Sequence, residues 1–285
     1  MVCLISKGYY MNNDKIKSMK LYNFIDRVYN ELKALGKEKS GDLSISELSS
    51  FDQLNYHGTE AIDYAIKKFN INEKSKVLEI GSGIGGPSRY IAQKTGAIVT
   101  ALELQNDHHE VGLELTKRCG LDNNVEHICG DFLTYDFKDN RYDTIVSWLA
   151  LYHIPEREKL LDICFKILKS NGNFFAEDFA YHKPFSIEES QELSTDFFAN
   201  YIVSYAGYVS DLNRKGFVGI EKDDMTKSWS EFTKLRFKAY QDNIERHTRV
   251  HNQDIVDNML YFYSFAKRYL DGGKLGGIRI SAKKE

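Results

Sequence analysis

The chain has 285 residues, of which 42% are hydrophobic and 28% are charged, and its 38 basic residues nearly balance its 41 acidic ones. This length suffices for one large hydrophobic core, and no apolar run reaches the roughly 18 residues that a membrane-spanning helix requires. The basic residues form neither a stripe of the kind that binds nucleic acid nor a polybasic patch for a membrane surface. We therefore expect a cytoplasmic globular protein, a monomer or homodimer, that has neither nucleic acid nor a membrane as a partner.

Residues 1–70 are expected to form a helical cap. From Asp14 to Leu35 apolar residues recur at helical spacing, and a glycine ends the run. Ser44 and Glu47 have the spacing of a capping box. Thr59 is expected to cap the next helix, over residues 60–69, which leaves three polar side chains on the loop before it: Gln53, Tyr56 and His57.

The glycine-rich stretch at residues 76–86, KVLEIGSGIGG, is the most informative part of the chain. An apolar strand runs into a turn with glycines at positions 81, 83, 85 and 86, and a helix follows. Glycine permits the sharp turn and the close approach of a ligand to the backbone. The N-terminal N–H groups of the following helix would point at that ligand.

The same glycines also match the G-x-G-x-x-G pattern of dinucleotide-binding proteins, so the turn alone leaves two cofactors open. Glu79 favours one of them, because it places a carboxylate two residues before the first glycine. A carboxylate there suits a cationic ligand better than a pyrophosphate.

Strands and helices alternate after the glycine-rich turn. We expect strands over residues 77–80, 98–102, 125–129, 144–147 and 173–177, with helices near residues 87–94, 107–118 and 156–168. This alternation is typical of a parallel sheet covered by helices, in which ligands bind at the carboxyl ends of the strands. The second strand leads to Glu103, and the third leads to Asp131 and Phe132.

The series of motifs resembles the class I S-adenosylmethionine-dependent methyltransferases over roughly residues 55–180. This resemblance implies a Rossmann-like α/β core at residues 71–183, with a mostly parallel seven-stranded sheet and helices on both faces. It implies S-adenosylmethionine as cofactor and S-adenosylhomocysteine as product, with a nicotinamide cofactor as the alternative. It places Gly81 and Gly83 at the methionine part, Glu103 at the ribose, and Asp131 and Phe132 at the adenine. The other expected cofactor-binding residues are Glu79, Ser82, Leu104 and Ser147.

Residues 184–285 differ from the core in pattern and are expected to form lid helices and two closing antiparallel strands within the same structural domain. Two further capping boxes, Ser186 with Glu189 and Ser228 with Glu231, predict two helices, and Asn252 opens a third. The strands are expected over residues 216–220 and 278–282. His247 and His251 lie four residues apart on a predicted helix, but the sequence offers no third ligand nearby, so we expect no metal site.

His153, which follows the fourth strand in SWLALYHIPERE, is the candidate catalytic base. An imidazole titrates near neutral pH and can accept a proton from the methyl acceptor. Its position resembles that of the phosphoethanolamine methyltransferases, in which a histidine and an N-terminal tyrosine act together, and Tyr56 would be the tyrosine here. The alternatives are a histidine that caps the next helix and a tyrosine that merely packs in the lid.

The substrate is expected to be a small molecule, with an amine nitrogen as the methyl acceptor. The phosphoethanolamine methyltransferases have an arginine five residues before the histidine to hold phosphate, and this chain has Trp148 there, which argues against a phosphorylated substrate. Trp148, Tyr152 and Tyr181 instead offer π faces to a cation, with Gln53 and His57 as further substrate contacts. GSGIGGPSRY is similar to the motif of the glycine, sarcosine and dimethylglycine N-methyltransferases. Oxygen methylation of a phenol or acid is the runner-up, and a non-catalytic cofactor-binding protein is a third alternative.

Overall fold

The computed structural model describes residues 25–37 and 41–285. The first part of the helix predicted from Asp14 lies outside the described residues. Its remainder is helix α2, Asp26–Ala34, which is followed by α3 at Ile45–Leu48.

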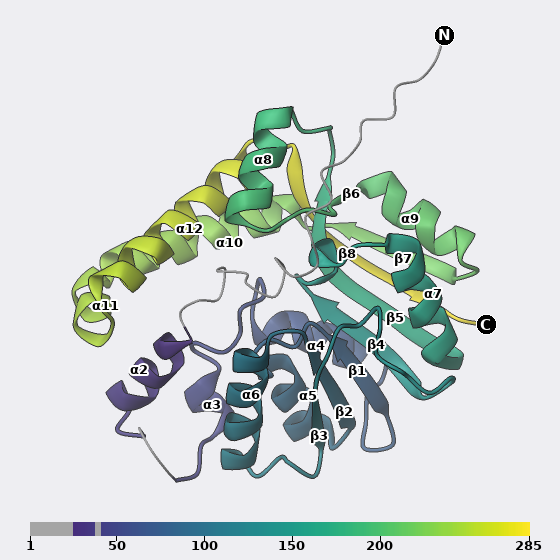
Figure 1. Cartoon of the computed structure of the whole chain (residues 1–285), viewed down its shortest axis with the longest axis horizontal. Helices are drawn as coiled ribbons and strands as arrows, with labels where there is room; N and C mark the ends of the chain where they lie inside the picture. The colour runs from purple at the N-terminus through teal and green to yellow at the C-terminus, as the bar shows by residue number, and fades with distance from the viewer. Residues whose placement is uncertain (1–24, 38–40) are drawn as a thin grey trace.

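One mixed sheet forms the centre of the molecule (Figure 1). Its strand order is β3-β2-β1-β4-β5-β8-β7, with the short β6 paired to β5. The pairs among β1 to β5 are parallel, and β8 runs antiparallel to both β5 and β7. The strands are β1 Lys76–Ile80, β2 Ile98–Glu103, β3 Val125–Cys129, β4 Tyr142–Trp148, β5 Leu168–Tyr181, β6 Val203–Ser204, β7 Val218–Asp224 and β8 Leu275–Lys283.

The predicted fold class is confirmed. The sheet has eight strands rather than the expected seven because the two-residue β6 adds to it. Strand order reverses between β1 and β4, so their carboxyl ends border the crevice where sheets of this type bind ligands. Strands β7 and β8 come from residues 184–285 but belong to the same sheet as the core strands.

Helices cover both faces of the sheet, and the alternation of side chains along the strands explains why. Leu78 and Ile80 of β1 pack in one apolar cluster with α7 (Arg157–Ile167) and α9 (Tyr205–Arg214). Val77, on the opposite face, packs in another cluster with α4 (Thr59–Lys68) and α5 (Gly86–Thr95). Successive strand residues point to opposite faces, so both faces need an apolar cover. Helix α6, Asn106–Arg118, joins the cluster that contains α2.

The remaining helices form the lid. They are α8 Ile187–Asp196, α10 Thr226–Asp242, α11 Ile244–Val250 and α12 Gln253–Asp271. Helices α10 and α12 lie side by side as an arm that projects beyond the sheet, and α11 at its tip contacts α2 (Figure 1). None of the helices among residues 25–37 and 41–285 is both long and apolar enough to span a bilayer.

The predicted helix starts were partly right. The capping boxes at Ser44–Glu47 and Ser186–Glu189 are both formed, and the Asn252 side chain accepts the N–H of Ile255. The box at Ser228–Glu231 is wrong, since α10 already begins at Thr226. The cap at Thr59 is also wrong, because α4 starts there and follows Gly58, whose φ is positive.

Candidate active site

A cavity of about 970 Å³ lies over the carboxyl ends of β1, β2 and β4 and reaches the lid. The loop at residues 50–56 and helices α10 and α12 contribute to its wall. Most of the predicted site residues line it: Gln53, Tyr56, Glu79, Gly81, Ser82, Gly83, Glu103, Leu104, Asp131, Phe132, Trp148, Tyr152 and His153.

Three glycines of the glycine-rich turn, at positions 81, 85 and 86, approach other parts of the chain too closely for a side chain. A Cβ on Gly81 would lie 2.3 Å from the Cβ of Ala150, and one on Gly86 would lie 2.4 Å from the carbonyl oxygen of Asp52. Gly83, in contrast, has a φ of +53°, and a Cβ added to it would meet no atom within 4 Å. The turn therefore presents bare backbone to the cavity at residue 83.

Glu103 ties the ends of β1 and β2 together. One of its carboxylate oxygens accepts the N–H of Gly83 at 2.8 Å, and the other accepts the N–H of Gln105 at 2.9 Å. The side chain is buried, and burial raises the pKa of Glu103. A carboxylate has about four acceptor positions, so lone pairs remain for the two hydroxyls of a ribose.

Glu79 is buried on β1 beneath the turn, with the hydroxyl of Ser88 donating to it. Burial raises the pKa of Glu79 to about 8, although Ser88 and Arg89 act in the opposite direction. An ammonium group beside it would favour the ionised form. Glu79 therefore fits a cationic ligand that displaces its proton.

Asp131 and Phe132 occupy the turn after β3. One carboxylate oxygen of Asp131 accepts the N–H of Leu133 at 2.9 Å, which fixes the side chain in this turn. Phe132 is buried, with its ring centroid 5.4 Å from that of Phe137. Together with bare backbone at Gly83 and the free lone pairs of Glu103, these residues fit S-adenosylmethionine as a ligand.

His153 ends the 3-10 helix Leu151–His153, which follows β4. Its Nδ1 lies 2.9 Å from the carbonyl oxygen of Phe198, which can only accept, so Nδ1 carries the hydrogen. Nε2 is buried and has no hydrogen-bond partner among the described residues. Burial lowers the pKa of His153 to about 4, so the ring is neutral at pH 7 and Nε2 has a lone pair to accept a proton.

Tyr56 packs in the aromatic wall of the lid. Its ring stacks on Trp229 with centroids 4.2 Å apart, and Phe179 and Phe232 meet it edge-on. Burial raises the pKa of Tyr56 to about 12, so the phenol keeps its proton at neutral pH. No hydrogen bond joins Tyr56 to His153 in the part of the chain that the structure describes, and the two remain separate members of the cavity wall.

Three predicted site residues do not line the cavity. Ser147 is fully buried, and its hydroxyl donates to the carbonyl oxygen of Ile80 at 2.9 Å. His57 makes a 2.8 Å hydrogen bond with Ser228. Tyr181 packs edge-on against Phe185, so it does not join Trp148 and Tyr152 in an aromatic cage.

Several lid residues that were not among the expected site residues also form the cavity wall. Phe232, Arg236 and Tyr240 line the cavity from α10, and Phe262 and Phe265 line it from α12. The spacing of the first three places them on one face of a helix. Leu235, an apolar residue of the same helix, is instead 70% exposed.

At the end of the cavity nearest α2, Glu31 lies beside the two histidines that had no predicted third ligand. One potential ligand atom each from Glu31, His247 and His251 lies within 4.8 Å of the others. However, Arg246 donates to both carboxylate oxygens of Glu31, at 3.0 and 2.6 Å. Burial acts to raise the pKa of Glu31, but hydrogen bonds from His251 and Arg246 lower it to about 2. The Arg246 guanidinium therefore already balances this carboxylate.

Comparison with known proteins finds similarity to methyltransferases. Residues 77–172 match the family model described as a methyltransferase domain. A phosphoethanolamine N-methyltransferase of Plasmodium falciparum is 26% identical over 205 residues, which are 69% of this chain and 73% of that protein. A sterol 24-C-methyltransferase of Gibberella zeae is 35% identical over 111 residues, covering 39% of this chain but only 29% of that protein.

A solved structure shows the same fold. Phosphoethanolamine N-methyltransferase 2 of Haemonchus contortus, in complex with phosphomonomethylethanolamine and S-adenosylhomocysteine, superposes with a TM-score of 0.81 at 19% identity, over 96% of this chain and 61% of that one. Residues 77–172 are therefore a methyltransferase domain, in a chain that has the fold of the class I S-adenosylmethionine-dependent methyltransferases.

Proposed function

We propose that this protein transfers a methyl group from S-adenosylmethionine to an amine nitrogen of a small molecule. The observation that carries the proposal is the neutral His153, whose Nε2 has no partner in the described residues and whose side chain lines the same cavity as the cofactor-binding residues. The relatives named as phosphoethanolamine N-methyltransferases support nitrogen as the acceptor atom.

The residues at the carboxyl ends of the strands would hold the cofactor. Glu103 would accept hydrogen bonds from the ribose hydroxyls, and Asp131 from the adenine amino group. Glu79 would face the cofactor's ammonium, beside the bare backbone of Gly83. When bound, the cofactor supplies an electrophilic methyl group on a sulfonium.

His153 would remove the proton that keeps an amine from acting as a nucleophile. An alkylammonium has no lone pair for attack, and Nε2 of a neutral imidazole can take its proton. The hydrogen bond from Nδ1 to Phe198 fixes the ring so that Nε2 stays available. The cavity then needs to hold the acceptor in line with the methyl group, and such positioning alone can lower a barrier by about 7–11 kcal/mol.

Tyr56 would position the acceptor rather than remove its proton. A phenol with a pKa of about 12 is a hydrogen-bond donor at neutral pH. Gln53 is a second positioning group, because its buried Oε1 has no partner among residues 25–37 and 41–285.

Carbon methylation is a second candidate, since several relatives are named as sterol 24-C-methyltransferases. The aromatic wall formed by Phe179, Phe232 and Phe262 would suit the cationic intermediate of such a reaction. Oxygen methylation of a phenol or acid would use His153 in the same way as nitrogen methylation.

One experiment separates these reactions. The pure protein is incubated with methyl-labelled S-adenosylmethionine and a pool of amines, amino acids, phosphobases, phenols and sterols, and mass spectrometry detects any product that gains the label. Fragmentation then locates the methyl group. A label on nitrogen supports the proposal, whereas a label on carbon or oxygen selects one of the alternatives. No labelled product in the presence of tight cofactor binding would count against all three.

A further inference from the structure

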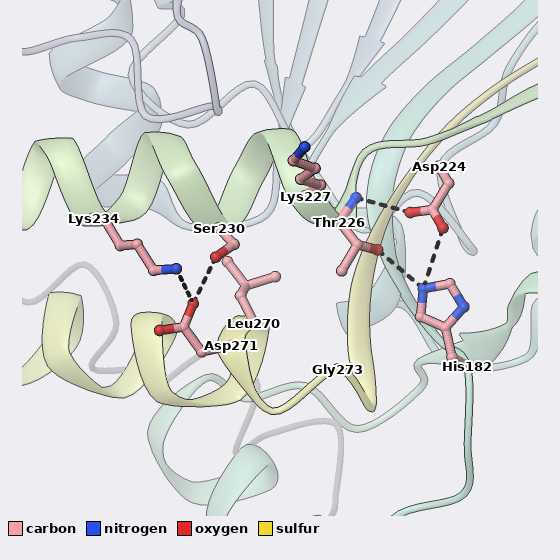
Figure 2. Close-up of a pocket in the computed structure, with 9 residues that line it drawn as sticks. All are labelled: His182, Asp224, Thr226, Lys227, Ser230, Lys234, Leu270, Asp271 and Gly273. Atoms are coloured by element: carbon pink, nitrogen blue, oxygen red, sulfur yellow. Dashed lines mark hydrogen bonds and ion pairs between the residues drawn. The ribbon is translucent and has the colours of Figure 1, made fainter.

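Some charged groups around the cavity and on the nearby surface are paired with other residues of the chain, and others are not. Glu31 pairs with Arg246 and His251. A second, shallower pocket near the start of α10 is also internally paired (Figure 2): Thr226 and Asp224 contact His182, and Ser230 and Lys234 contact Asp271. In both clusters, other protein groups already bind the carboxylate oxygens.

Two arginines of the cavity wall, Arg27 of α2 and Arg236 of α10, have no ion pair with a described carboxylate, and the one that lies beside Gln53 and the aromatic wall is Arg236. Its only hydrogen bond with the described residues is a long one, 3.5 Å, from Nη2 to the carbonyl oxygen of Gln53. No carboxylate within the described ranges lies within ion-pair distance of it. A guanidinium has five N–H donors in a planar fork that matches carboxylate and phosphate oxygens, so most of its donors are available to a ligand.

The surroundings of Arg236 place it next to the predicted transfer site. Its guanidinium lies 5.0 Å from the ring centroid of Phe232, and the same ring meets Tyr56 edge-on at 5.9 Å. Phe262 and Met259 of α12 line the cavity as well. Aromatic and aliphatic walls exclude water, and a charge-assisted hydrogen bond is stronger where water is excluded.

We infer that the methyl acceptor carries an anionic group, a carboxylate or a phosphate monoester, that binds to Arg236 while its apolar part packs on the aromatic wall of α10 and α12. This inference rests on the proposed methyltransferase function. It replaces the expectation that phosphate is disfavoured because Trp148 stands where relatives have an arginine: a different arginine, from the lid, supplies the positive charge.

The test uses the protein loaded with S-adenosylhomocysteine and three probes of similar shape: phenylacetate, phenyl phosphate and the neutral phenylacetamide. Isothermal titration calorimetry should show that at least one anion binds tenfold or more tightly than the amide. Arg236→Gln should abolish this preference, and Arg236→Lys should keep part of it. The matched control is Lys238→Gln, which removes a cation from the exposed side of α10 where Lys238 pairs with Asp242.

The relative affinities of phenylacetate and phenyl phosphate indicate which anion the site prefers. The inference is wrong if neither anion binds more tightly than the amide, including the case in which no probe binds, or if Arg236→Gln retains the preference. Unchanged affinity of each variant for S-adenosylhomocysteine verifies its fold. Binding is measured here without turnover. A failure of methyl transfer would therefore overturn the proposed function and leave the measured anion preference unchanged. A missing anion preference would overturn the inference about Arg236 and leave the methyl-transfer result unchanged.

Discussion

At the residue scale, Glu103 has two tasks, because it joins the backbones of two loops and faces the cavity. Glu103→Ala should weaken the binding of S-adenosylhomocysteine at least tenfold, since the ribose loses its acceptor and Gly83 loses the partner that fixes its N–H. Calorimetry measures the change. Glu103→Gln, which keeps an acceptor oxygen, should weaken binding less. Equal affinities for the wild type and Glu103→Ala would mean that the cofactor lies elsewhere.

Glu79 should make cofactor binding depend on pH. Its pKa is about 8 in the free protein because it is buried, and an ammonium beside it favours the ionised form. Binding should therefore release a proton, and the affinity for S-adenosylhomocysteine should rise between pH 6.5 and 8 by up to about tenfold per pH unit. Calorimetry across this range measures the slope. Glu79→Gln should remove most of it, and an identical slope in this variant would contradict the assignment.

At the element scale, the ion pair between Arg89 and Asp52 connects helix α5 to the loop that carries Gln53 and Tyr56. Both side chains are fully buried and lie 2.9 Å apart. Arg89→Met should lower the free energy of unfolding by about 3–5 kcal/mol, because it leaves the Asp52 carboxylate buried without its partner. Urea denaturation measures this loss.

The matched control for that prediction is the double variant Arg89→Met with Asp52→Asn. It removes both charges and should be more stable than Arg89→Met alone, because no unpaired buried charge remains. If the double variant is instead less stable by the sum of both single effects, the two residues act independently and the ion pair does not explain the anchoring of the loop.

The strands of the core could be predicted from the sequence, whereas the start of the lid helix α10 could not. Short, mostly apolar runs such as residues 77–80 are buried on both faces of a parallel sheet, and their composition predicts them. The start of α10 was misplaced because Ser228 and Glu231 have the spacing of a cap while Ser228 bonds to His57 instead. A capping-box pattern describes only residues close in the sequence. The Ser228 hydroxyl instead bonds to His57, which is 171 positions away.

At the scale of the whole molecule, buried acids should make the free protein less stable as the pH rises. Burial raises the pKa of Glu79 to about 8 and that of Asp178 to about 7, whereas in the unfolded chain both titrate near 4. The native state therefore holds more protons than the unfolded state at neutral pH. The two acids make their full contribution to the free energy of unfolding below about pH 4. That contribution is lost as the pH rises through their native pKa values of about 7 and 8.

The free energy of unfolding without cofactor should thus fall between pH 6.5 and 8, by up to about 1.4 kcal/mol per pH unit for each acid. Two buried histidines offset only part of this fall: His127 and His153 have native pKa values of about 3 and about 4 but titrate near 6.5 in the unfolded chain, so their opposing effect is confined to the lower end of the window. Urea denaturation at three pH values measures it. The double variant Glu79→Gln with Asp178→Asn should show a flatter profile, and an unchanged profile would mean that these two acids do not cause the fall.

For the molecule as a whole, the sequence predicted the strand-end side of the cavity better than the lid side. Strand ends place Glu79, Glu103 and Asp131 together by topology, so a sequence pattern suffices to find them. The lid side is formed by α10 and α12 packing against the core, and the face that each helix turns inward depends on that packing. Arg236 was therefore one of several lid arginines in the sequence, and it is distinguished because it lines the cavity and has no carboxylate partner among the described residues.

The central claim is that His153 takes the proton of the acceptor in this cavity. The most direct test is the rate of labelled methyl transfer at saturating cofactor, measured from pH 4 to 8 for the wild type and His153→Ala with an acceptor found in the pool. We expect His153→Ala to lower the rate at neutral pH by about 10²-fold or more, with an unchanged affinity for S-adenosylhomocysteine. The wild-type rate should fall only as the pH approaches about 4, where His153 gains a proton. Equal rates and equal pH profiles for the two proteins would contradict the claim.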